Sequence, residues 1–224
     1  MARRSSTPRE TLTRERVLRA AMETADEVGV DALTMRSLGQ RLGVEAMSLY
    51  NHVANKDDVL DAIVDMAVAE IEPTATAGDW RAAIRAGALS ANEVLRRHPW
   101  ACALWFQRYP GPARIRYMEG LLACLGRSRL PDEIAHHAYH VIDTYIVGFT
   151  AQQHTFVIGG DELEAAAKGF LGELSADDHP HVIAHVHEHL SPTPAGTSAF
   201  EFGLDLILDG LHRRRTPKAD RLSR

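Results

Sequence analysis

The sequence predicts an all-α fold in two parts, and three observations support this. Nearly every segment longer than ten residues repeats its apolar side chains at the helical period. No run alternates apolar and polar residues as a half-buried strand would. Glycine and proline separate most of these segments, and residues 73–79 form the only linker in the first half of the chain. We therefore expect a first domain over residues 1–72, a helical bundle over 80–214 and a tail over 215–224.

Composition and charge indicate a soluble protein with a basic beginning. Charged residues make up 25% and hydrophobic residues 45% of the 224 positions, which is typical of globular domains. No apolar run is long enough to cross a membrane and no apolar leader begins the chain, so we expect a cytoplasmic protein without a membrane partner. Cys102 and Cys124 lack metal-ligand spacing. The net charge is −5, yet residues 1–20 hold six arginines and two glutamates, so residues 1–12 form either a DNA-binding arm or a solvated tail.

The first part is expected to contain four helices. Thr34 is a good N-cap and Gly43 a good left-handed stop for the second of them, and Asn55 with Asp58 forms a capping-box-like beginning for the fourth. The expected limits are Thr13–Gly29, Thr34–Gly43, Glu45–His52 and Asn55–Pro73. Further helices are expected at about 80–98, 112–127, 131–158, 162–174, 180–190 and 197–214.

The segment from Thr34 to Val53 predicts a helix-turn-helix. Two short helices cross steeply only where the residues at their closest approach are small, and Gly39 on the inner face and Gly43 in the turn meet that need. The second helix then fits the major groove of DNA. The candidate DNA-binding residues are Thr34, Arg36, Ala46, Met47, Ser48, Tyr50, Asn51, His52 and Lys56. A helical corner that binds no DNA is the alternative that spacing alone leaves open.

The expected roles within this set differ. Asn51 can pair bidentately with adenine, and Met47 can lie against a thymine methyl group. Tyr50, His52 and Lys56 suit contacts to phosphate. Lys56 also stands at the beginning of a helix, where the backbone N–H groups and the helix dipole favour an anion.

A family resemblance is carried by residues 42–56, which read Leu-Gly-Val-Glu-Ala-Met-Ser-Leu-Tyr-Asn-His-Val-Ala-Asn-Lys. They resemble the recognition helix and following turn of the TetR family, and the Leu-Tyr-x-His-Val-x-Asn-Lys portion resembles its tetracycline-repressor branch. Residues 199–211 are similar to the final helix of that branch. The resemblance implies an all-α homodimer with an N-terminal three-helix helix-turn-helix DNA-binding domain, a C-terminal helical-bundle ligand-binding and dimerisation domain, and a palindromic operator in double-stranded DNA.

The sequence departs from that branch at two functional places. Ala46, Met47 and Asn51 differ from the residues with which the branch reads its operator, so the operator sequence cannot be carried over. Trp105 and Gln152 fall where the branch has a metal-ligating histidine and its carboxylate. Neither side chain can replace the lost metal ligand, and we therefore expect an effector other than a metal-chelated tetracycline.

The final helix carries apolar residues on two faces, so it needs two neighbours: its own domain and something else. The helix at 131–158 offers a complementary surface, and two such helices from each chain would form a four-helix interface. The expected dimer-interface residues are Ile134, Val141, Ile142, Tyr145, Phe202, Gly203, Leu206 and Gly210. Both helices can instead be central in a monomer core, but the resemblance and the need of a helix-turn-helix for a second half-site favour a homodimer.

The central helices hold an aromatic and polar mixture that suits an effector pocket, which needs apolar walls and a few polar groups. The candidate ligand-binding residues are Trp105, Phe106, Tyr109, Tyr139, His140, Asp143 and Gln152. Plain core packing is the alternative for each of them. His181, His185 and His189 share a helix face at a spacing that can bind zinc, but no cysteine or carboxylate set accompanies them. We expect no metal site and no cofactor.

These features predict a homodimeric repressor that a small-molecule effector releases from DNA. An activator or co-repressed regulator of the same fold and a histidine-based metal sensor are the alternatives. An enzyme is not expected, because the sequence has no Gly-x-Ser-x-Gly motif and no phosphate-binding glycine loop.

Overall fold

The computed structural model describes residues 11–75, 77–155, 161–190 and 198–215, which form eleven helices and no strand. The first four are α1 (Arg14–Val28), α2 (Met35–Leu42), α3 (Ala46–Leu49) and α4 (Lys56–Ala69). The other seven are α5 (Trp80–Arg97), α6 (Trp100–Leu104), α7 (Pro112–Arg127), α8 (Asp132–Thr155), α9 (Asp161–Gly172), α10 (Pro180–Leu190) and α11 (Ala199–His212). The all-α prediction is confirmed over the described residues.

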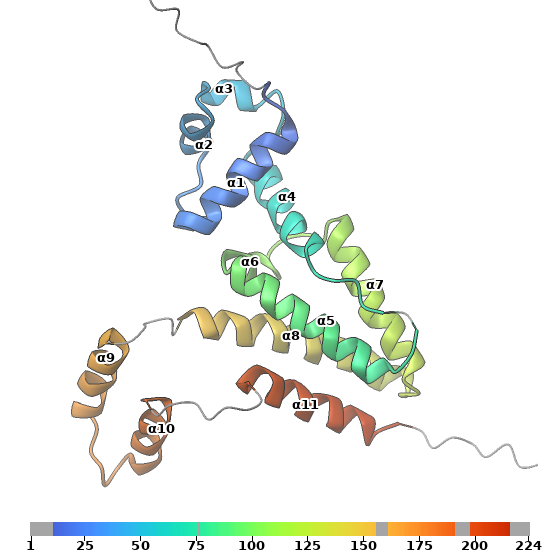
Figure 1. Ribbon diagram of the computed structural model, residues 1–224, viewed down its shortest axis with the longest axis vertical. Helices are drawn as coiled ribbons and strands as arrows, with labels where there is room; N and C mark the ends of the chain where they lie inside the picture. Colours follow the sequence, from blue (N-terminus) through green and yellow to red (C-terminus); the bar gives the residue numbers. More distant parts are fainter. Residues whose placement is uncertain (1–10, 76, 156–160, 191–197, 216–224) are drawn as a thin grey trace, which may run out of the picture.

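Helices α1, α2 and α3 form one end of the molecule, and α4 leads from them to the second part (Figure 1). α4 packs on α1 and also on α5, α6 and α7. In the second part α5, α7 and α8 pack on one another, and α11 lies against α8 and α5. α9 and α10 lie to one side of this bundle and pack on each other. α4 therefore packs on helices of both parts.

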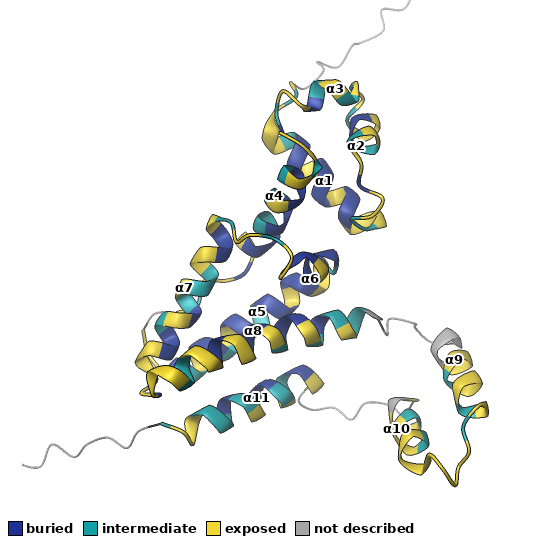
Figure 2. Cartoon of the chain, turned by 180° about the vertical axis from the view of Figure 1, so that it is seen from behind, coloured by how far each residue is buried: buried dark blue, intermediate teal, exposed yellow. Residues whose placement is uncertain are grey.

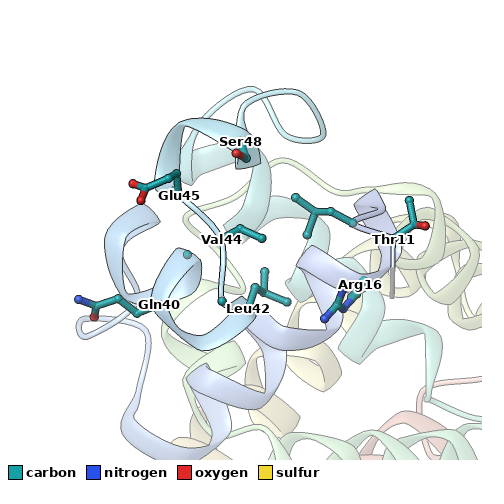
Figure 3. Close-up of a pocket in the computed structure, with 10 residues that line it drawn as sticks. Thr11, Arg16, Gln40, Leu42, Val44, Glu45 and Ser48 are labelled. Carbon is teal, nitrogen blue, oxygen red and sulfur yellow. The ribbon is translucent and has the colours of Figure 1, made fainter. Parts of the chain in front are cut away.

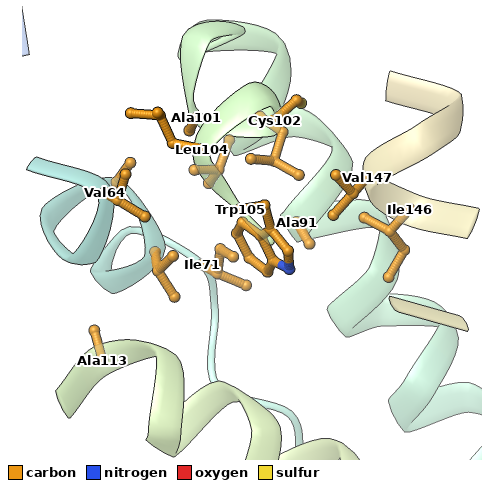
Figure 4. Packing of buried hydrophobic residues seen from close by; sticks show 14 of the residues in the cluster. Val64, Ile71, Ala91, Ala101, Cys102, Leu104, Trp105, Ala113, Ile146 and Val147 are labelled. Atoms are coloured by element: carbon orange, nitrogen blue, oxygen red, sulfur yellow. The ribbon is translucent and has the colours of Figure 1, made fainter. Parts of the chain in front are cut away.

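A continuous apolar core runs through both parts of the fold. The buried faces of the helices turn toward their neighbours, whereas α9 and α10 are mostly exposed (Figure 2). The fully buried Trp105 lies between Val64 of α4, Ala113 of α7 and Ile146 of α8 (Figure 4). Because these side chains come from both parts of the sequence, α4 cannot move against the bundle without disturbing the packing around this indole.

Most helices lie within a few residues of their expected limits, and the larger differences are at α3, α6 and α8. The third was expected over 45–52 but α3 contains only Ala46–Leu49. No helix was expected between 98 and 112, where α6 is found. The eighth ends its described part at Thr155, and the last residues of its expected range lie outside the described chain. None of the described helices is both long and apolar enough to cross a lipid bilayer.

Candidate nucleic-acid interface and effector site

The helix-turn-helix is built as the glycine positions predicted. Gly43 ends α2 in the left-handed region, with φ +67°. Gly39 is buried, and a Cβ placed on it would lie 3.0 Å from the Val44 carbonyl oxygen and 3.1 Å from the Ala46 backbone nitrogen. Only a residue without a side chain lets α2 approach the next helix this closely. Thr34 caps α2, since its hydroxyl accepts from Ser37 N–H at 3.0 Å while the Ser37 hydroxyl accepts from Thr34 N–H at 2.9 Å.

α3 presents a short outward surface above a buried anchor. Leu49 is fully buried, whereas Met47 is 75% and Tyr50 is 45% exposed. After Leu49 the chain continues as a tight turn, in which His52 N–H donates to Leu49 O at 2.9 Å. Asn51 is exposed in this turn and not on a helix, contrary to the expected limits. Asn51 therefore stands in the turn that follows α3 and not on the helix itself.

Two arginines of this region have structural partners. Arg14 forms a bidentate pair with Asp58, at 2.9 and 2.7 Å, and also donates to His52 O. Arg41 pairs bidentately with Glu27, at 2.6 and 2.7 Å. Bidentate pairs fix orientation as well as distance, so they hold α1 against α2 and α4.

The remaining candidate DNA-binding residues lie at the beginning of α2, on α3 and at the beginning of α4. Thr34 and Arg36 are exposed at the beginning of α2, and Ala46 and Ser48 are partly exposed on α3. Lys56, the first residue of α4, donates to Val30 O at 3.5 Å, so its ammonium group lies beside the loop before α2. Lys56 and the exposed Arg36 thus both lie next to the beginning of α2, Lys56 beside the loop that precedes this helix and Arg36 within it.

A surface groove of about 610 Å³ runs between the beginning of α1 and the turn from α2 to α3 (Figure 3). The side chains that line it include Thr11, Arg16, Gln40, Leu42, Val44, Glu45 and Ser48. The groove is a hollow of the helix-turn-helix itself, and none of the candidate effector residues lines it.

Asp58 makes the stability of the helix-turn-helix end depend on pH. The hydrogen bonds from Arg14 and from Ala54 N–H lower the pKa of Asp58 from 3.8 to about 2. A carboxyl group whose pKa is depressed in the folded state stabilises the protein above its unfolded pKa and loses that contribution as pH falls through its folded pKa. We expect Asp58→Asn to lower the free energy of unfolding by about 1 kcal/mol at neutral pH, because the pair is partly exposed.

Below pH 3.8 the difference between wild type and Asp58→Asn should shrink, and it should vanish only below the folded pKa of about 2. Urea denaturation across this pH range measures it, with the exposed Asp31→Asn as the matched control. A difference in the free energy of unfolding that stays constant down to pH 2 would contradict the lowered pKa of Asp58.

Asp65 of α4 caps the N-terminus of α7 from outside that helix. Its two carboxylate oxygens accept from Ala113 N–H at 3.1 Å and from Arg114 N–H at 3.0 Å. The N-cap residue Gly111 has no side chain to do this, and a Cβ placed on it would lie 2.5 Å from Asp65 Cγ. A carboxylate at a helix N-terminus satisfies free N–H groups and interacts favourably with the helix dipole. α4 is thereby fastened to α7 by a cap between the two parts.

In further polar contacts between the two parts, a carboxylate of α1 or α4 again faces a donor group of the second part. Asp26 of α1 accepts from Trp100 Nε1–H at 2.6 Å and lies 2.7 Å from His98 Nδ1. On α4, Asp57 and Asp61 pair with Arg108 at 2.8 and 3.3 Å. The joint between the parts thus includes ion pairs and hydrogen bonds in addition to the apolar packing.

We expect Asp65→Ala to lower the free energy of unfolding by about 1–2 kcal/mol, because α7 loses the carboxylate that caps its N-terminus. Asp61→Ala is the matched control: Asp61 stands one turn earlier on α4, is 49% exposed and forms a surface pair with Arg108. That pair contributes about 0.5 kcal/mol. Urea denaturation of both variants measures the difference, and equal losses would show that Asp65 acts as an ordinary surface charge.

The predicted effector residues separate into two groups. Trp105, Tyr139 and Asp143 are buried together, and Trp105 Nε1–H donates to Asp143 Oδ2 at 3.2 Å. Phe106 and Tyr109 are 60% and 94% exposed. His140 and Gln152 are also exposed. The structure therefore brings three of the seven candidates into one buried site.

Arg114 belongs to the same buried site, although the sequence did not single it out. It is 8% exposed, its guanidinium lies 4.6 Å from the centre of the Trp105 ring, and it donates to Trp105 O. Burial lowers the pKa of Arg114 and raises that of Asp143, and each charge opposes the shift of the other. The sequence of α7 contained a pattern that could have identified Arg114. This arginine lies at helical spacing from two buried leucines, Leu121 and Leu125. A charged residue on the buried face of a helix indicates a polar site in the core.

The predicted dimer residues lie mostly on one outer face. Val141 is 50%, Phe202 63% and Leu206 56% exposed. A groove of about 380 Å³ between α8 and α11 is lined partly by residues of the predicted interface. These lining residues are Ile134, Val141, Leu206 and Gly210. The outer surfaces of α8 and α11 therefore form one apolar face.

Three members of the predicted interface have contacts within the chain. Ile142 has no exposed surface and belongs to the apolar core, whereas its neighbour Val141 is 50% exposed; Ile142 is corrected to a core residue. Tyr145 stacks on Phe200, and its hydroxyl donates to Phe200 O at 2.8 Å. Gly203 lies against the Tyr145 ring and leaves no room for a Cβ. These contacts hold α11 on α8.

Among the described residues no three histidine, cysteine or acidic side chains are placed to hold a metal ion. His181 and His185 are exposed on α10, and the side chain of His189 lies outside the described residues.

Comparison with known proteins identifies both parts of the chain. Residues 17–63 match the family model described as bacterial regulatory proteins, tetR family, and residues 72–215 match the tetracyclin repressor-like C-terminal domain. The chain is 32% identical to the HTH-type transcriptional repressor DrrR1 of Streptomyces coeruleorubidus, over 93% of this chain and 80% of that one. It is 31% identical to the tetracycline repressor class A of Escherichia coli, over 89% and 90% of the two chains.

A crystal structure of ActR of Streptomyces coelicolor in complex with (S)-DNPA has the same fold, with a TM-score of 0.72 and 28% identity over 91% of this chain and 98% of that one. The family consists of regulators and not of enzymes. The matches cover the recognition element as well as the bundle that holds Trp105 and Asp143. The chain belongs to the TetR family of DNA-binding transcriptional regulators.

Proposed function

We propose that this protein is a homodimeric repressor that leaves a palindromic operator when a small molecule binds among α5, α6, α7 and α8. The observation that carries the proposal is the joint at α4. This helix continues from the recognition element, and it is fastened by the Asp65 cap to the helix that carries Arg114. Movement at the buried site is thereby coupled to the DNA-binding end. Such a coupling typically amounts to about 1–3 kcal/mol.

The dimer is supported by the apolar outer face of α8 and α11. Exposed apolar side chains that gather at one place often mark an interaction surface; Val141 and Leu206 line the groove between α8 and α11, and Phe202 is exposed on α11. A two-fold symmetric pair of α8 and α11 would form a four-helix interface. It would also present two recognition elements to two half-sites.

We propose a DNA-binding domain over residues 1–72, a linker over 73–79, an effector-binding and dimerisation domain over 80–214 and a tail over 215–224. α4 belongs to the first domain by sequence, but it packs on α5, α6 and α7 of the second. The DNA-binding domain is therefore not expected to fold stably when the chain is cut at the linker.

Fluorescence anisotropy with DNA from upstream of the gene, at several salt concentrations, tests DNA binding. Arg36→Ala and Lys56→Ala should each weaken binding to every sequence and reduce the slope of log K against log salt by about 0.9, because each removes one phosphate contact. Arg116→Ala, an exposed arginine of α7, is the matched control and should change nothing. Unchanged slopes in Arg36→Ala and Lys56→Ala would remove these two residues from the interface.

An activator of the same fold would bind DNA in the same way and would differ only in the sign of the coupling. A reporter gene downstream of the selected operator separates the two functions. Lower expression with the regulator than without it supports the repressor, and higher expression supports the activator.

A further inference from the structure

The outer surface of α3 is formed mainly by one large apolar side chain. α3 contains only Ala46, Met47, Ser48 and Leu49. Leu49 is fully buried, and Met47 stands two residues before it, which places the two side chains roughly 200° apart around the helix. Met47 is accordingly 75% exposed. The part of α3 that projects farthest from the core of the domain is therefore a thioether side chain.

The other residues of α3 are used within the domain. The backbone nitrogen of Ala46 lies beside Gly39 of α2, at 3.1 Å from a Cβ placed on that glycine. Ser48 is partly exposed and lines the groove beside the beginning of α1 (Figure 3). None of the four residues of α3 carries a charge or an amide group. The bidentate pairings of arginine with guanine and of asparagine or glutamine with adenine are thus absent from this helix.

The chemistry of the major groove limits what such a surface can recognise. The second helix of a helix-turn-helix faces the base edges there, and most groups on these edges are hydrogen-bond donors or acceptors. A thioether against such an edge would remove water without replacing its hydrogen bonds, which is unfavourable. The apolar group that the groove displays is the 5-methyl group of thymine. A flexible, polarisable methionine side chain packs well against it.

We propose that Met47 selects the operator by contact with the 5-methyl group of a pyrimidine in each half-site. The inference rests on the proposed function and adds the chemical feature of the bases that α3 reads. Because the contact is with the methyl group and not with the rest of the base, 5-methylcytosine should be favoured over cytosine at the same position, as thymine is over uracil. Burial of one methyl group corresponds to about a fourfold change in affinity.

Replacement of thymine by uracil tests the proposal, because it removes the methyl group and leaves the base pairing and the O4 acceptor in place. The DNA is the operator that the full-length protein selects from a random library, and each thymine is replaced in turn in both half-sites. Anisotropy titration should find at least one position where uracil weakens binding about 15-fold, since the two contacts add. At that position 5-methylcytosine should bind about 15-fold more tightly than cytosine.

Variants of Met47 connect this methyl preference to its side chain. Met47→Ala should bind the thymine and uracil operators equally at the identified position, whereas Met47→Leu keeps an apolar side chain and should retain most of the preference. Val28→Ala is the matched control, because Val28 is a 62% exposed apolar residue at the end of α1 and not on α3. It should show the full wild-type preference. The double-mutant cycle of protein and base separates the contact from any effect of uracil on DNA shape.

The proposal is overturned if uracil is tolerated at every position, or if the selected half-sites contain no thymine. It is equally overturned if Met47→Ala keeps the wild-type preference for the methyl group, since another residue then makes the contact. These results differ from failure of the proposed function, in which the wild-type protein selects no sequence. Tight binding to a selected operator that ignores the methyl groups leaves the regulator in place and removes only the role of Met47.

Discussion

Gly39→Val is expected to abolish specific DNA binding while the effector bundle stays folded. A Cβ at this position already lies 3.0–3.2 Å from backbone atoms of Val44 and Ala46, and these atoms cannot move without shifting α3. The two further methyl groups of valine force the two helices apart, and such overpacking destabilises a protein by about 1–3 kcal/mol. The affinity for operator DNA should fall at least ~100-fold, because the recognition element no longer sits at its angle to α2.

Gly126→Val is the matched control, since it places the same side chain on a helix where a Cβ meets nothing within 4 Å. Its DNA affinity should equal that of the wild type. Anisotropy measures binding, and the near-ultraviolet circular dichroism of the tryptophans, all three of which lie in the second part, reports its packing. Normal DNA binding by Gly39→Val would mean that the close approach of α2 and α3 is unnecessary for recognition.

Leu206→Glu is expected to separate the dimer and thereby weaken operator binding at least ~100-fold. In the proposed interface each protomer contributes Leu206, so one substitution buries two unpaired carboxylates near the symmetry axis. Each buried charge costs several kcal/mol, and every 1.4 kcal/mol raises the dissociation constant of the dimer tenfold. A monomer carries one recognition element and can bind only one half-site at a time.

Leu122→Glu provides the comparison, because Leu122 is a 41% exposed leucine on α7 that does not line the groove between α8 and α11. Analytical ultracentrifugation should find Leu122→Glu dimeric and Leu206→Glu monomeric. A dimeric Leu206→Glu variant would place the interface elsewhere.

The sequence was most informative where structure is local. The caps at Thr34 and Asn55 and the stop at Gly43 were predictable, because each depends on residues within four positions. The capping box at Asn55 formed only in part: Asn55 accepts from Asp58 N–H, but the Asp58 carboxylate accepts from Ala54 N–H and pairs with Arg14. A partner 44 positions away competes with the local one, and a local pattern contains no information about it.

The features that the sequence did not predict are those for which the local pattern of residues contains too little information. α6 contains five residues, which is too few to show a helical period. Ile142 and Val141 are neighbours on a helix with two apolar faces, and the sequence does not say which face meets the chain's own core. The Asp65 cap joins residues 48 and 49 positions apart, so only the folded structure brings its donor and acceptor together.

Selection of binding sites from a random DNA library by the full-length protein tests the central claim most directly. A dimer with two recognition elements should enrich an inverted repeat whose half-sites lie about one helical turn, or a multiple of it, apart. Leu206→Glu, carried through the same selection, should lose the repeat. Enrichment of a single unrepeated half-site by the wild-type protein, or of no sequence at all, would contradict a dimeric, sequence-specific regulator.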